Sequence, residues 1–238
     1  LGGLFALTGV LALVGLGVLY GIAPPEPVLH TQAPRGRLAE VLGNPALLRL
    51  HLGVFVLHAV QLAVWLAIPA LLVQAGLASN AHWMVYLPAV LASFAVMGFT
   101  LFPMERRGQL RTVFLGSVAL VALVQLGLLW AADAPVLWVL ALLLFLFFCG
   151  FNVLEASQPS LVSRLAPAHA RGAALGVYNT LQSLGFFVGG ALGGWLLQAG
   201  GAPMLFGTCA LAMGLWLALA WPMTAPGRTG SQAASESA

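Results

Sequence analysis

"FLFFCGFNVLEASQPSLVSRLAP", residues 145–167, contains the features that decide the fold. It begins as an uninterrupted apolar run, carries Asn152, Glu155 and Gln158 in its middle, and meets its first cation at Arg164. Crossing about 30 Å of hydrocarbon takes roughly 20 residues of helix, and the run is long enough. The stretch therefore predicts a membrane-spanning helix that holds an ionisable side chain inside the bilayer.

The whole chain has the same apolar character. Of its 238 residues, 61% are hydrophobic and only 6% are charged, whereas a soluble domain is about one quarter charged. Cys149 and Cys209 lie in separate apolar runs, which is typical of small buried hydrophobes. The composition therefore predicts a membrane protein with no cofactor, no metal site, no nucleic-acid partner and no enzymatic activity.

Seven apolar runs are long enough to span the bilayer, and nothing in them alternates as barrel strands would. They cover residues 2–23, 46–75, 83–103, 110–131, 135–164, 169–198 and 203–222. We expect an all-α polytopic bundle of seven transmembrane helices. Residues 24–45 are expected to form a Pro-rich linker between two bundles, and the polar residues 223–238 a disordered tail.

The arginines all lie on one side of this predicted topology. They flank or fill alternate connections and the tail, at positions 35, 37, 49, 106, 107, 111, 164, 171 and 228. The other connections contain no arginine, and only Asp133 charges that face. The positive-inside rule makes the arginine-rich side cytoplasmic, with the linker and the C-terminal tail on it.

Polar side chains are grouped on single faces of three of the predicted helices. The stripes comprise His58, Gln61 and Trp65 in 46–75, Asn152, Glu155 and Gln158 in 135–164, and Tyr178, Asn179, Gln182 and Ser183 in 169–198. The last helix also carries Gly185, Gly189 and Gly193, and small residues four apart allow close helix packing. His58 equally suits a simple interhelical hydrogen bond. Haem ligation would need a second histidine at matched depth, and His51 and the others are expected at or beyond helix ends.

Three stretches resemble one transporter family. "LFPMERRGQLR" (101–111) is similar to its loop motif Gly-x-x-x-Asp-Arg-x-Gly-Arg-Arg, with Glu105 at the Asp place and Arg106 and Gly108 matched. The glycines from Gly176 to Gly194 resemble its antiporter motif, which the family carries on its fifth helix rather than the eleventh. Residues 152–182 closely resemble the tenth-to-eleventh helix segment of bacterial, proton-driven, drug-efflux-like members. The family is the major facilitator superfamily.

This resemblance implies a domain plan. Residues 1–23 would be the last helix of a missing N-terminal half, 24–45 the inter-bundle linker, 46–222 the six-helix C-terminal bundle and 223–238 the tail. It further implies an antiporter in the bacterial inner membrane that moves a small solute by proton-coupled efflux and alternating access. Its partners would be the solute, protons, the lipid bilayer and the missing half. The alternative is a membrane sensor or assembly subunit that binds a lipid or a partner and transports nothing.

Site residues follow from the same resemblance. The substrate cavity would be lined by His58, Gln61, Trp65, Asn152 and Gln182. Gating or coupling would fall to Glu155, Glu105, Arg106, Arg107, Arg111, Arg164 and Arg171. Glu155 lies nine residues, or about 14 Å, inward of Arg164. It would serve as a latch that pairs with Arg106, Arg107 or Arg171, as a proton or substrate site, or as an ordinary packed residue, and the latch is the favoured hypothesis.

Overall fold

The computed structural model describes residues 2–21 and 38–223, and all of their regular secondary structure is helical. The chain divides into two compact units, Leu1–Pro34 and Arg35–Ala238. In the first unit the apolar helix α1 covers Gly2–Gly21. Most of the predicted linker, 24–37, and the predicted tail beyond Met223 lie outside the described residues.

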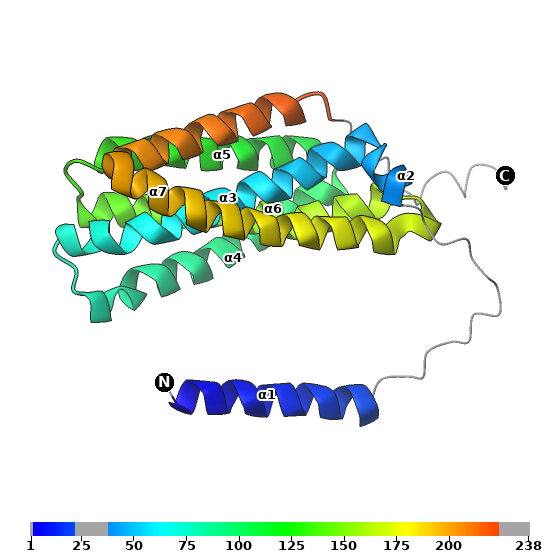
Figure 1. Ribbon diagram of the computed structural model, residues 1–238, viewed down its shortest axis with the longest axis horizontal. Helices are drawn as coiled ribbons and strands as arrows, with labels where there is room; N and C mark the ends of the chain where they lie inside the picture. Colours follow the sequence, from blue (N-terminus) through cyan, green and yellow to red (C-terminus); the bar gives the residue numbers. More distant parts are fainter. Residues whose placement is uncertain (1, 22–37, 224–238) are drawn as a thin grey trace. The chain divides into compact units, whose positions relative to one another are not determined.

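The second unit is a bundle of long helices (Figure 1). Its elements are α2 (Leu38–Leu42), α3 (Pro45–Gln74), α4 (Trp83–Arg106), α5 (Leu110–Ala131), α6 (Leu137–Leu165) and α7 (Arg171–Ala220), with short 3-10 turns η1 (Ser79–Ala81) and η2 (Ala168–Ala170). An all-α fold is thus confirmed for the described residues, and the predicted spans match α3 to α6 to within three residues.

Local chemistry explains where the helices start and turn. Asn44 caps α3, because its side chain accepts hydrogen bonds from the amides of Ala46 (3.0 Å) and Leu47 (3.4 Å), and Pro45 supplies the first helical residue. Gly108, with φ +74°, makes the turn between α4 and α5 in a conformation that favours glycine. Because α4 continues to Arg106, Glu105 stands on a helix rather than in the loop predicted to follow residue 103.

The helix α7 changes direction near its middle. The backbone angles of Gly200 and Gly201 are not helical, and Gly201 has φ +68°. Figure 1 shows the chain reversing there, so the residues up to 199 and those from 202 form two antiparallel legs. These legs correspond to the two helices predicted at 169–198 and 203–222.

Five helical segments of the described chain are long and apolar enough to cross a membrane: 45–74, 79–106, 110–131, 137–165 and 168–220. The apolar part of α1, Phe5–Gly21, is shorter. The exact number of seven crossings remains a prediction, which would require α1 to span and each leg of α7 to cross once.

Candidate functional site

Glycines allow α3 and the first leg of α7 to approach each other closely. A Cβ added to Gly185 would lie 2.5 Å from the carbonyl oxygen of Phe55, and one added to Gly189 would lie 2.7 Å from Cα of Ala59. Gly193 faces Ala63 in the same way, at 3.3 Å. The two helices therefore touch backbone to backbone and run in the same direction (Figure 1).

This close contact brings three polar side chains from three helices together. His58 of α3 and Glu155 of α6 form a pair with 3.1 Å between Nε2 and Oε2. Gln182 of α7 places its amide nitrogen 2.8 Å from His58 Nε2 and 3.2 Å from Glu155 Oε1. We call His58, Glu155 and Gln182 the polar triad. The imidazole is buried, whereas 39% of the Glu155 side chain is exposed, so the triad is open on one side.

Hydrogen-bond geometry fixes where the protons of the triad lie. Nδ1 of His58 is 2.8 Å from the carbonyl oxygen of Val54, and a carbonyl only accepts, so Nδ1 carries a hydrogen. In the neutral ring Nε2 is then an acceptor, and the Gln182 amide group donates one hydrogen to it and the other to Glu155. Glu155 Oε2 is near Nε2 but makes no aligned hydrogen bond, so it can accept or share a proton there.

A proton on His58 Nε2 would rearrange this triad. The ring would become a cation that donates to Glu155 Oε2, and the amide hydrogen of Gln182 would face an N–H instead of a lone pair. The Gln182 amide N–H would have to leave His58, either by withdrawal of the side chain or by a turn of the amide that lets Oε1 accept from Nε2. The triad can thus adopt two hydrogen-bond arrangements that differ by one proton, and in the neutral-ring arrangement the Gln182 amide N–H groups join α7 to both α3 and α6.

The other predicted cavity residues lie on the same helices and have separate partners. Asn152 donates from Nδ2 to Ser93 Oγ at 2.8 Å, which joins α6 to α4. Trp65 packs against Phe148, with 6.0 Å between ring centroids. The buried Oε1 of Gln61 has no hydrogen bond within the described part of the chain.

The predicted gating residues are not all brought together. Glu105 at the end of α4 pairs with Arg164 at the end of α6. Arg111 donates to the carbonyl oxygens of Met223 (2.8 Å) and Trp221 (2.7 Å), so it holds the end of α7. Three further arginines are exposed and make no ion pair among the described residues: Arg106, Arg107 and Arg171.

Glu155 therefore has a different partner from the expected arginine. In this conformation the charged or titratable group beside it is His58, which sequence reasoning had placed in the cavity but had not linked to Glu155. Sequence reasoning also missed His51, expected near a helix end and found fully buried inside α3. Tyr178 was assigned to the polar stripe without a role, and the structure buries it with no hydrogen bond to its hydroxyl within the described part of the chain.

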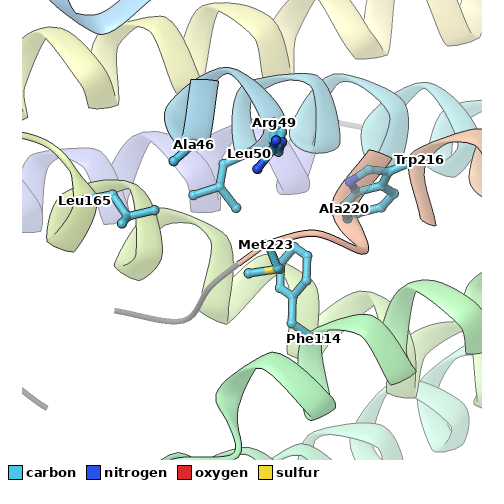
Figure 2. A pocket seen from close by; sticks show the side chains of 8 residues that line it. All are labelled: Ala46, Arg49, Leu50, Phe114, Leu165, Trp216, Ala220 and Met223. Carbon is cyan, nitrogen blue, oxygen red and sulfur yellow. The ribbon is translucent and has the colours of Figure 1, made fainter. Parts of the chain in front are cut away.

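Two of the hollows in the described part of the chain bear on the search for a solute site, and both lie apart from the triad. One, at the arginine-rich end, has a volume of about 30 Å³, enough for about two water molecules. Figure 2 shows Arg49, Phe114, Trp216 and Met223 among the side chains around it. The other is an apolar cleft of about 440 Å³ between α4 and α6 near the opposite end, lined by residues such as Pro88 and Trp138. Only the second has the size of a small-molecule site.

Comparison with known proteins places the chain among transporters. The Major Facilitator Superfamily model matches residues 2–190 and 52–238. The inner membrane transport protein YajR of Escherichia coli K12 is 34% identical over 228 residues, which cover 94% of this chain and 50% of that protein. The multidrug resistance protein MdtH of Aeromonas salmonicida is 30% identical over 190 residues, 77% of this chain and 47% of that protein. The chain thus spans about half the length of these relatives.

Proposed function

Because the chain belongs to the Major Facilitator Superfamily, we propose that it is the C-terminal half of a secondary transporter that exports a small solute in exchange for protons. Residues 176–194 resemble an antiporter motif and residues 152–182 resemble drug-efflux members of the family, which supports export. The relative MdtH is named a multidrug resistance protein, which agrees with this direction. The missing half would complete the solute path by covering the open side of the triad.

The observation that carries the proton coupling is the polar triad. An ionisable residue inside a membrane span is costly and is usually functional. Here a carboxylate, an imidazole and an amide meet within 3.2 Å, and the addition of one proton would change the hydrogen bonds between them. Such a network converts proton binding into a change in how three helices are tied together, which is what coupling requires.

Binding of the solute and binding of the proton would compete for the Glu155 carboxylate. With a neutral His58 ring, Gln182 bridges His58 and Glu155, and the partly exposed carboxylate can contact a solute on the open side of the triad. With the proton bound, the His58 cation pairs with the carboxylate, and the solute is excluded. The apolar cleft between α4 and α6 and the ring of Trp65 would favour a solute with a sizeable apolar part.

The arginine-rich end would be cytoplasmic, with the chain in the bacterial inner membrane. In this conformation the pair of Glu105 and Arg164 ties α4 to α6 at that end. It would hold the cytoplasmic side closed, which assigns the latch role to Glu105 rather than to Glu155.

The test is Glu155→Gln in the full-length transporter, reconstituted in proteoliposomes with ethidium as the transported probe. Ethidium movement driven by a pH gradient should stop, whereas ethidium exchange at equal pH should continue, because the amide keeps the shape of the side chain but has no negative charge to stabilise a proton on His58 Nε2. The control Asp133→Asn changes the same charge at an exposed site and should leave both modes unchanged. Equal loss of both modes in Glu155→Gln would instead favour a latch, and wild-type behaviour would refute the proposal.

A further inference from the structure

A groove lies between α4 and α5, away from the proposed solute path. Its volume is about 220 Å³, and α6, on which both helices pack, contributes to it as well. The side chains that line it are mostly apolar and include Val96, Met104, Val113, Leu120, Cys149 and Val153. Drug-sized ligands occupy about 300–1,000 Å³, so the groove suits a thinner occupant than the proposed solute.

The groove and the triad lie on different faces of α6. Cys149 and Val153 line the groove, whereas Glu155 lies about 120–160° further round the helix at 100° per residue. The missing half would cover the open side of the triad, where part of Glu155 is exposed. We therefore expect that half to leave the groove uncovered and the groove to face the hydrocarbon of the bilayer.

The wall that α4 contributes is long and largely apolar. Val96, Thr100 and Met104 follow one another every four residues and extend for about 12 Å along the helix. The Thr100 hydroxyl donates to the carbonyl oxygen of Val96 at 2.8 Å, so it needs no polar ligand in the groove. An alkyl chain against this wall would therefore leave no buried hydroxyl unpaired.

The stripe of residues along this wall ends at an arginine. Arg107 lies three residues after Met104, and its N–H donates to the carbonyl oxygen of Pro103 at 3.1 Å, so the helical spacing of α4 continues to it. At that spacing Arg107 is on the same face as Met104. Its side chain is exposed, at the arginine-rich end that the charge pattern predicts to be cytoplasmic.

The charge of Arg107 has no counter-ion among the described residues. The nearby carboxylate of Glu105 pairs with Arg164 instead. The N–H groups of the turn are also occupied, since those of Gly108 and Gln109 donate to backbone carbonyl oxygens at 3.0 Å and 2.9 Å. An anion at this end of the groove would therefore be bound by the guanidinium, whose planar fork matches two phosphate oxygens.

We propose that Arg107 and the groove form a binding site for one anionic phospholipid of the cytoplasmic leaflet. The phosphate pairs with the Arg107 guanidinium, and one acyl chain lies in the groove between α4 and α5. The cytoplasmic leaflet supplies this ligand, because its anionic lipids give it a negative surface potential that attracts basic residues. The site requires the arginine-rich end to be cytoplasmic, but it requires neither export nor proton coupling.

The bound chain takes the place of direct packing between α4 and α5. Both helices pack on α6 more than on each other, so the chain fills the space between them. A shift of α4 relative to α5 changes the width of the groove. Occupancy of the lipid site therefore depends on the position of α4.

Native mass spectrometry of the purified full-length transporter tests the site, with dioleoylphosphatidylglycerol and dioleoylphosphatidylcholine supplied in equal amounts in the micelles. The wild-type protein should retain phosphatidylglycerol in preference to phosphatidylcholine. Arg107→Gln should reduce this preference about fivefold, which is the usual contribution of one arginine near an anionic surface. The control Arg171→Gln removes another exposed arginine that has no ion pair among the described residues, and it should leave the preference unchanged.

Gly116→Leu tests the groove separately from the charge. A Cβ at Gly116 would meet nothing within 4 Å, so a leucine can enter the groove, and retention of both lipids should fall. Gly214→Leu adds the same side chain at an equally open and exposed glycine of α7, and it should leave retention unchanged.

Equal retention of the two lipids by the wild-type protein, or unchanged retention in Gly116→Leu, would overturn the proposal. Displacement of phosphatidylglycerol by millimolar inorganic phosphate would also overturn it, because the acyl chain would then have no role in binding. A dimer that carries no lipid and is lost in Gly116→Leu would assign the groove to a second copy of the chain and refute the lipid site. None of these measurements uses ethidium transport, so failure of the lipid site and failure of the proposed function are distinguishable.

Discussion

The glycine contact between α3 and α7 leads to a quantitative prediction for Gly189→Ala. The added methyl group would lie 2.7 Å from Cα of Ala59 and closer still to its carbonyl oxygen, distances that real Cβ atoms essentially never show. The obstructing atoms belong to a helix backbone, which has no rotamer to change, so the helices must separate. Overpacking of this kind costs about 1–3 kcal/mol.

The same helix provides the matched control. A Cβ at Gly194 would meet nothing within 4 Å, so Gly194→Ala brings only the gain in helix propensity, up to about 1 kcal/mol. At Gly193 the nearest atoms are 3.2 Å away and include a flexible leucine side chain, so the cost there is smaller. The free energy of unfolding should therefore fall most for Gly189→Ala, less for Gly193→Ala, and rise for Gly194→Ala.

Unfolding in mixed micelles with increasing SDS, followed by circular dichroism, measures this order. The unfolding midpoint of Gly185→Ala should lie close to that of Gly189→Ala, because the added Cβ would lie 2.5 Å from the carbonyl oxygen of Phe55. Equal midpoints for Gly189→Ala and Gly194→Ala would show that α3 and α7 do not touch through this face, and the geometry of the polar triad would be refuted with it.

The remaining predictions concern membrane topology and the polar contacts between α4 and α6. A single cysteine at the exposed position 109 should be protected from an impermeant thiol reagent in intact cells, whereas one at the exposed position 133 should be labelled. The native Cys149 and Cys209 are buried and should not react. Asn152→Ala and Ser93→Ala should show a coupling free energy of about 0.6 kcal/mol in a double-mutant cycle, typical of a membrane hydrogen bond, and independent effects would contradict the contact. Glu105→Arg and Arg164→Glu should each impair ethidium transport, and the double exchange should restore it if the pair holds the end of the bundle closed.

Much of the helical architecture could be predicted, because the bilayer sets a length that the apolar runs must satisfy. Residues 110–131 were predicted as a helix with the same bounds as α5. The polar stripe of His58 and that of Glu155 were also predictable, because spacing at 100° per residue places side chains on one face of a helix.

The partner of Glu155 was not predictable from the same rules. Spacing within one helix fixes a face, but it does not fix the register between helices that are far apart in sequence. Opposite charge favoured an arginine, whereas the packing of α3, α6 and α7 brings His58 to the carboxylate. His51 was misplaced for a related reason: α2 and η2 cover the end of α3, so a residue only six positions into the helix is fully buried.

The contacts between helices indicate which helices move when the triad gains or loses a proton. The α3–α7 contact is made by backbone atoms at Gly185, Gly189 and Gly193, so it has no alternative arrangement and should move as one rigid body. The helix α4 packs mainly on α6, and its polar contacts with α6 among the described residues include the hydrogen bond between Ser93 and Asn152 and the ion pair between Glu105 and Arg164. Glu155 lies on α6, between this second body and the first.

Protonation of the triad should therefore shift α4 and α6 together against α3 and α7. Spin-label distances between exposed positions 91 on α4 and 184 on α7 should change with pH, whereas distances between 52 on α3 and 184 should stay constant. A pH-dependent change of the second distance would show that the glycine contact itself gives way.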